Sequence, residues 1–185
     1  IQWLKACQNS DGYWGENPGG RSIAAVHYYY PVIALIMAEG SSTPEVINAL
    51  NWWRSYYPTN PVWHIGKLMP MVYAGSLSDV ETFVPPVLNC QNPDGGWPEA
   101  YGWPSRDATT ARAVIALLKA KELGVSGLDD PTSRGLCWIN QHITEDGGFI
   151  GAYESVYATG WTISVLSLLY PYTFPPINCA IQLYI

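Results

Sequence analysis

The sequence predicts an all-α protein whose helical hairpins pack as two layers in a ring or an arc. Apolar residues recur at helical spacing along most of the chain. A turn motif repeats, as "DGYWG" (11–15), "DGGWP" (94–98) and "DGGFI" (146–150). Helices with one apolar side alternate with helices that are apolar nearly all round. Such hairpins bury both faces only by stacking on their neighbours, so we expect the one-sided helices in an outer layer and the others in an inner layer.

The first elements follow this alternation. An outer helix at 1–8 precedes the first turn motif, and an inner helix is predicted over 22–39, with Ser22 as its N-cap and Ala34 on its buried side. The next outer helix spans 42–57. Thr43 is its expected N-cap, and its buried stripe comprises Val46, Leu50, Trp53 and Tyr57.

The second inner helix is predicted over 62–75, with a bend at Pro70. It pairs with the helix at 42–57, in the long gap between the first two turn motifs. We therefore expect a hairpin there that has lost its own turn motif. An outer helix follows over 76–91. Its expected features are a Ser78–Glu81 capping box and a break at Pro85 and Pro86.

The third inner helix is predicted over 105–123, with Ser105 as N-cap, Ile115 buried and Gly124 at its end. An outer helix capped by Asp130 comes next. The remaining elements are an inner helix at 155–170, capped by Ser155, and an outer helix at 175–185.

These elements amount to about four and a half hairpins in a single domain, 1–185. A closed double ring of six hairpins would need about twelve helices, more than the sequence predicts. The ring is therefore expected to be incomplete, or the chain to be a piece of a longer protein.

Composition excludes several functions. Charged residues make up 13% of the chain and the net charge is −6, with no basic run that could follow a nucleic-acid backbone. The four cysteines show no metal-ligand spacing, so free thiols are expected and neither a metal nor a cofactor is predicted. The longest strongly apolar run, at 28–38, is too short to span a bilayer. Tyr and Trp dominate the aromatics, and their polar tips suit a surface that meets a ligand.

The turn motifs carry a family resemblance. Two copies share a glutamine three residues before the aspartate and a tryptophan three residues after it; the third has Asp146 and Phe149. They resemble the glutamine–tryptophan repeat of squalene and oxidosqualene cyclases, whose double ring of helices, the α/α toroid, is shared with the β subunits of protein prenyltransferases. The resemblance implies this fold and a structural role for the motif, in which it ties outer helices together. The residues of the two full copies are Gln8, Asp11 and Trp14, and Gln91, Asp94 and Trp97.

Asp107 is the candidate catalytic residue. At the third position of the aligned inner helices the chain has Ala24, Asp107 and Tyr157, so the repeat does not explain the carboxylate. The segment 105–109 resembles the Asp-x-Asp-Asp-Thr motif of class II terpene cyclases. That motif's middle aspartate protonates an alkene or epoxide. Only the middle Asp and Thr109 match, and both flanking carboxylates are replaced. The alternative is an acid favoured in a first helical turn by the helix dipole.

Other residues on the predicted inner helices could complete this site. His64 and His27 could pair with Asp107, or each could be a satisfied buried histidine. Aromatic side chains could stabilise a carbocation through their ring faces, or pack the two layers together. These aromatics are Tyr28, Trp63, Tyr157 and Trp161. The zinc site of the prenyltransferases is not expected, because the sequence lacks their Asp-x-Cys pair.

Three functions remain open from the sequence. The first is an isoprenoid- or lipid-handling domain, with Asp107 as the general acid of a protonation-initiated cyclisation. The second is a non-catalytic ring that binds a lipid or a protein. The third is an acid-polysaccharide lyase that would use Arg106, Arg112 and Lys67. The expected partners are a polyprenyl or other apolar small molecule, a peripheral membrane surface and a domain that completes the ring. The compartment is left open.

Overall fold

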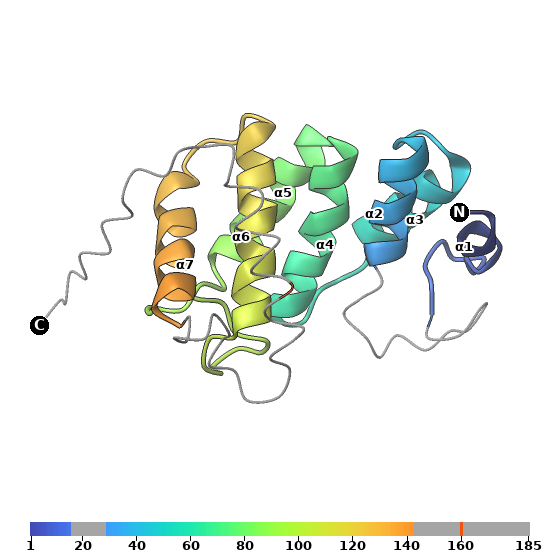
Figure 1. The fold of residues 1–185 in the computed structure, drawn as a ribbon. Coiled ribbons are helices and arrows are strands. Elements are labelled where there is room, and N and C mark those ends of the chain that lie inside the picture. Colours follow the sequence, from blue (N-terminus) through green and yellow to red (C-terminus); the bar gives the residue numbers. More distant parts are fainter. Residues whose placement is uncertain (16–28, 143–159, 161–185) are drawn as a thin grey trace, which may run out of the picture.

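The computed structural model describes residues 1–15, 29–142 and 160. These residues form seven α-helices and no strand, with one isolated bridge between Pro98 and Ser105. The predicted all-α class is therefore confirmed for the described part of the chain (Figure 1). The helices predicted at 155–170 and 175–185 lie outside it. The helices are α1 (Gln2–Ala6), α2 (Tyr29–Glu39), α3 (Pro44–Ser55), α4 (Pro61–Ala74), α5 (Leu77–Leu88), α6 (Asp107–Glu122) and α7 (Asp129–Gln141).

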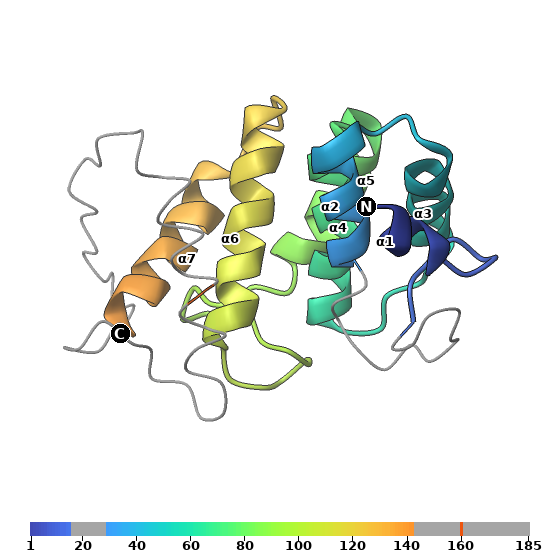
Figure 2. The same cartoon turned by 45° about the vertical axis from the view of Figure 1, so that its right-hand side comes forward.

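The helices pack in two rows. Helix α4 packs against both α2 and α6, and these three begin at the same end of the molecule (Figures 1 and 2). Helices α3, α5 and α7 run in the opposite direction; α3 packs against α2 and α4, α5 against α4 and α6, and α7 against α6. The pair α3–α4 fills the gap between the first two turn motifs, as predicted.

Burial separates the two rows as their sequences predict. Ten of the fourteen residues of α4 are buried, and α6 is buried continuously from Ala108 to Leu117. Helix α3 instead buries one stripe, Val46, Ala49, Leu50 and Trp53. We call α2, α4 and α6 the inner row and α3, α5 and α7 the outer row. Most of the largest fully buried side chains lie on the inner row, and each contributes roughly 1.5–3 kcal/mol when it is removed from water.

Two expectations for the outer helices are wrong. Helix α3 ends at Ser55 and Tyr56 is extended (ψ 132°), so Tyr57 leaves the buried stripe and is 85% exposed. Helix α5 is not broken by Pro85 and Pro86. It continues to Leu88 because Val80, Val84 and Val87 remain buried in the core, which offsets the backbone hydrogen bonds that the prolines cannot make.

Several predicted caps are also shifted. Helix α5 begins at Leu77, and the Ser76 hydroxyl bonds the Asp79 carboxylate, so the Ser78–Glu81 capping box is not formed. Helix α7 begins at Asp129 rather than after Asp130. Thr43 occupies the N-cap of α3 without a side-chain bond to the helix. Gly124 follows α6 with a φ of +96°, which confirms its predicted place at the helix end.

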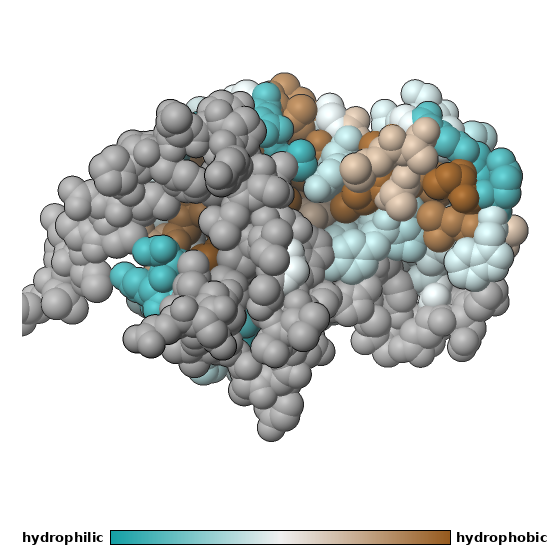
Figure 3. Space-filling view, viewed as in Figure 1, coloured by the Kyte–Doolittle hydropathy of each residue, from teal (hydrophilic) through white to brown (hydrophobic). Residues whose placement is uncertain are grey.

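The predicted inner side of α2 is also partly wrong. Ile115 on α6 is buried as expected, but Ala34 on α2 is exposed, and Met37 on the same helix is 75% exposed. Helix α2 buries Tyr29, Val32, Ile33 and Leu35 instead. In the space-filling view, brown and tan surface lies over the region of α2 (Figure 3). Helix α4 has inner-row neighbours on two sides, whereas α2 packs against one inner helix among those described.

Cys7 and Cys90 are buried and Cys137 is half-buried. Cys179 lies outside the described residues. Among the described helices, none combines the length and the apolar character that crossing a bilayer requires.

Candidate functional site

The glutamines of the two turn motifs make equivalent bridges. The amide of Gln8 donates to Gly12 O at 2.7 Å, within its own turn, and to Glu45 O at 2.8 Å, in the first turn of α3. The amide of Gln91 donates to Gly95 O and to Pro131 O, both at 2.9 Å, and Pro131 lies in the first turn of α7. Each glutamine therefore ties the turn after one outer helix to the start of the next outer helix.

The tryptophans join each turn to the outer helix that precedes it. We call the paired glutamine and tryptophan contacts of one motif a staple. Trp14 Nε1 donates to Leu4 O at 2.7 Å, and Trp97 Nε1 donates to Val87 O at 2.8 Å, so each indole bonds the outer helix that precedes it. Trp97 is fully buried and Trp14 nearly so. The structural role predicted for the motif follows from these contacts.

The turn glycines allow close approach between these segments. A Cβ on Gly12 would lie 2.5 Å from Asn48 O of α3, and one on Gly95 would lie 2.8 Å from Arg134 O of α7. Both residues also have positive φ values, near +90°. Any side chain at these positions would push the turn away from the outer helix and weaken the glutamine bridge.

The Asp94 carboxylate joins its own turn to the segment before α6 and to α7. Its Oδ1 accepts from Gly96 N and from the Ser105 hydroxyl, and its Oδ2 accepts from Trp138 Nε1 of α7 at 3.1 Å. Ser105 is thus committed to the turn, which corrects its predicted role as N-cap of α6; that position is held by Arg106. Sequence reasoning missed this network because Trp138 comes from a distant helix.

Asp107 is the first residue of α6, and its side chain is half-buried. Its Oδ1 accepts from Ala108 N at 2.8 Å. Its Oδ2 is buried and has no hydrogen-bond partner among the described residues. The hydroxyl of the fully buried Thr109 is likewise without a partner there. The two residues that match the acidic cyclase motif therefore both carry an unsatisfied oxygen.

His64 and Trp63 lie on the first turn of α4, at the end where α6 also begins. Burial lowers the pKa of His64, and the nearby charge of Lys67 lowers it further. In the described part of the chain, no hydrogen bond or ion pair joins His64 to Asp107. The structure therefore gives no support for their predicted pairing.

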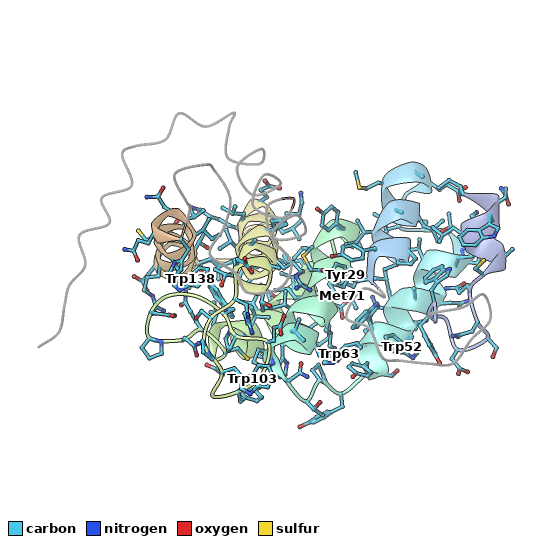
Figure 4. The ribbon with its side chains drawn as sticks, turned by 60° about the horizontal axis from the view of Figure 1, so that its bottom comes forward. Tyr29, Trp52, Trp63, Met71, Trp103 and Trp138 are labelled. Atoms are coloured by element: carbon cyan, nitrogen blue, oxygen red, sulfur yellow. The ribbon has the colours of Figure 1, made fainter. Side chains whose placement is uncertain are left out.

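Trp63 belongs to an aromatic cluster between the two layers. Its ring centroid lies 5.0 Å from that of Tyr56 and 6.3 Å from that of Trp53. The cluster extends through Trp52 to Tyr13 (Figure 4). These contacts favour a packing role for Trp63 over its alternative role in lining a cavity.

Lys67 is a buried cation with a structural task. Its ammonium donates to Arg54 O at 3.0 Å and to Tyr56 O at 2.7 Å, at the end of α3, and lies 4.3 Å from the Phe83 ring centroid. Burial lowers its pKa, while the Asp79 carboxylate acts in the opposite direction. The lysine thus holds the α3–α4 connection.

Sequence reasoning also missed an exposed aromatic loop. Tyr101 and Trp103 stand on the loop before α6, where the first repeat copy has Pro18 and Gly20. This departure from the repeat was the available signal.

Six residues of the predicted site and turn motifs lie outside the described part of the chain, as do the predicted caps Ser22 and Ser155: His27, Tyr28, Asp146, Phe149, Tyr157 and Trp161. Within the described part, no group of three or more His, Cys, Asp or Glu side chains could hold a metal ion. The chain matches no protein-family model and no curated protein.

Proposed function

We propose that the chain is an isoprenoid-handling domain of the squalene-cyclase type, folded as part of an α/α toroid, with Asp107 as the general acid of a protonation-initiated cyclisation. The two rows of oppositely directed helices and the repeated Gln–Trp staples support the toroid. The single observation that supports the catalytic role is the buried Oδ2 of Asp107, which has no hydrogen-bond partner among the residues that the structure describes.

This oxygen matters because buried polar atoms normally find partners. Oδ1 already accepts a hydrogen bond from Ala108 N at the N-terminus of α6. The helix terminus therefore does not need Oδ2 as a second acceptor. A carboxyl group whose second oxygen is free can hold its proton there and present it to an alkene or epoxide carbon. The proton would leave Asp107 as the C–H bond forms, and the carboxylate left behind would be stabilised by the helix N-terminus.

A second candidate, a non-catalytic ring that binds an apolar ligand or a protein, rests on the flanking positions. Ser105 and Ala108 replace the two outer carboxylates of the acidic motif, and Ser105 is bonded to Asp94 and Asn92. No neighbouring carboxylate from that motif is therefore present to polarise Asp107. We do not extend the proposal to a polysaccharide lyase, because the Lys67 ammonium is occupied by two carbonyl groups.

The test compares Asp107→Asn with Asp129→Asn. Both aspartates are the first residue of their helix, so both variants lose a similar dipole interaction, worth a few tenths of a kcal/mol to about 1 kcal/mol. The proteins are incubated with squalene, oxidosqualene and geranylgeranyl diphosphate, and products are measured by mass spectrometry. A general acid contributes roughly 10²–10⁴-fold in rate, so Asp107→Asn should lose nearly all turnover while Asp129→Asn keeps it. If the wild type converts none of the three, or Asp107→Asn stays active, the binding ring replaces the cyclase.

A further inference from the structure

The segment that leads into α6 is bonded to the second turn motif. The Ser105 hydroxyl donates to Asp94 Oδ1 at 2.7 Å, and Arg106 N donates to Trp97 O at 2.9 Å. Ser105 and Arg106 directly precede Asp107, the first residue of the helix. The turn motif therefore fixes the backbone on the N-terminal side of the proposed general acid.

The first turn of α6 is bonded to the same motif. Thr110 is fully buried, and its Oγ1 accepts a hydrogen bond from Trp97 N at 2.9 Å. Asp107 lies between these attachments, and its Oδ1 accepts from Ala108 N at 2.8 Å. Its Oδ2 has no hydrogen-bond partner among the described residues. The position of Oδ2 is therefore set by the backbone of 105–110, which the turn motif holds on both sides of Asp107.

Asp94 is itself held by α7. Its Oδ2 accepts from Nε1 of Trp138 on that helix at 3.1 Å (Figure 4), while its Oδ1 accepts from Gly96 N as well as from Ser105. Trp138 is buried, and the His142 ring stacks on it with the ring centroids 3.8 Å apart. Asp94 thus connects an outer helix to the start of an inner helix.

The first turn motif is built differently at the equivalent positions. Trp52 of α3 corresponds to Trp138 of α7, because each lies seven residues after the carbonyl group that the glutamine of its motif bonds. Trp52 packs on Tyr13, with ring centroids 4.9 Å apart, and the second motif has Gly96 in place of Tyr13. A Cβ on Gly96 would lie 2.5 Å from Ser105 Cβ and 3.0 Å from the Trp138 ring. The glycine therefore lets both side chains reach the turn.

The bond between Ser105 and Asp94 is suited to fixing a position more than to stabilising the fold. It is exposed, and water can replace either partner, so its loss should leave the protein folded. Proton transfer is more sensitive to position than folding is, because a displacement of about 1 Å can lower a rate by about 10²-fold.

We propose that Asp94 and Ser105 are positioning residues that hold the Asp107 carboxyl group in the orientation needed for proton transfer. This role rests on the proposed function, and it gives the second turn motif a task beyond joining outer helices. Ser105 stands where the acidic cyclase motif has its first carboxylate, so a hydroxyl that fixes the helix start takes the place of that carboxylate.

The test compares kcat and KM of Ser105→Ala and Asp94→Ala with those of the wild type. The substrate is whichever of squalene, oxidosqualene and geranylgeranyl diphosphate the wild type converts. In both variants kcat should fall about tenfold or more because the acid is displaced, while KM stays within about twofold. Ser105→Thr keeps the hydroxyl and should retain most of the kcat. Asp11→Ala removes the exposed aspartate at the equivalent place in the first motif and should leave kcat within about twofold.

Two kinetic results would overturn the positioning role. One is a kcat within about twofold of wild type in both Ser105→Ala and Asp94→Ala, which would leave Asp107 as the general acid without this support. The other is an equal loss of kcat in Asp11→Ala, because any weakened turn motif would then have the same effect.

An inactive wild type would instead overturn the proposed function, and amide hydrogen exchange would then decide the positioning role. If the turn motif fixes the helix start, the Ala108 amide should exchange about tenfold or more faster in Ser105→Ala than in the wild type. The Ile115 amide in the middle of α6 should exchange at the same rate in both proteins. An unchanged rate at Ala108 would overturn the positioning role.

Discussion

Replacing Trp97 with alanine tests whether the turn motif holds the fold together. The indole is fully buried, its Nε1 donates to Val87 O, and a Cβ on Gly135 of α7 would lie 2.8 Å from its ring. It therefore fills the space between α5, α6 and α7, and no small side-chain movement can replace it.

The expected loss in unfolding free energy is about 3–5 kcal/mol, the usual cost of truncating a buried Trp or Phe to Ala. The orphaned Val87 carbonyl contributes to it, since an unsatisfied buried acceptor costs roughly 1–3 kcal/mol. Small domains are stable by about 5–15 kcal/mol, so the variant should lose about a fifth of its stability or more.

Two companion variants separate the contributions. Trp97→Phe keeps most of the ring and removes the Nε1 donor, so it should cost less than Trp97→Ala. Trp14→Ala removes the equivalent indole of the first copy. It should also cost less, because α1 has five residues and buries none of them.

Urea denaturation followed by circular dichroism at 222 nm gives each free energy. A Trp97→Ala protein within about 1 kcal/mol of wild type would refute the reasoning, because it would mean that the site collapses without cost. So would unchanged stability combined with lost binding of an apolar ligand, because the indole would then belong to a binding site.

Two further predictions concern Lys67 and Asp79, which bond residues at the end of α3. Lys67→Met should destabilise the fold by about 1–3 kcal/mol in the same urea assay, because the Arg54 and Tyr56 carbonyls lose their donor; an unchanged midpoint would mean that water replaces the ammonium. Burial raises the pKa of Asp79. Hydrogen bonds from Arg54 and Ser76 and the charges of Arg54 and Lys67 together outweigh this effect, so the folded-state pKa lies below the ordinary value. Its stabilising contribution is therefore present above about pH 4 and lost as pH falls through the folded pKa, so stability should fall less steeply below about pH 4 in Asp79→Asn than in wild type. Parallel pH profiles for the two proteins would contradict this.

The helices and the staples were predictable because their signals are local. Val46, Leu50 and Trp53 recur at helical spacing, and Gln91, Asp94 and Trp97 stand within seven residues of one another. Their partners lie on the next outer helix, whose approximate start was indicated by the Thr43–Pro44 and Asp130–Pro131 pairs. Periodicity and turn chemistry act over a few residues, so the sequence alone specified the all-α class, the alternation of helices and the structural role of the motif.

The helix ends and the candidate site depended on contacts between distant segments. Ser105 was expected to cap α6, but Asp94, fixed by Trp138 of α7, bonds its hydroxyl instead. Tyr57 continues the apolar spacing of α3, yet Lys67 bonds the carbonyls at the end of that helix, and Tyr57 lies in water. Such contacts join residues that no sequence window contains.

The surroundings of Asp107 and Ala34 also depend on contacts between distant segments. The sequence placed Asp107 in the first turn of an inner helix, and its resemblance to the acidic motif made it the candidate general acid. Only the tertiary structure decided that one of its oxygens is bonded to Ala108 N and the other is buried without a partner in the described residues. Ala34 shows the reverse case, since its apolar neighbours predicted burial but α2 packs against a single described inner helix and leaves it exposed. Burial depends on which segments come together in space, and a residue's own sequence neighbours do not determine that.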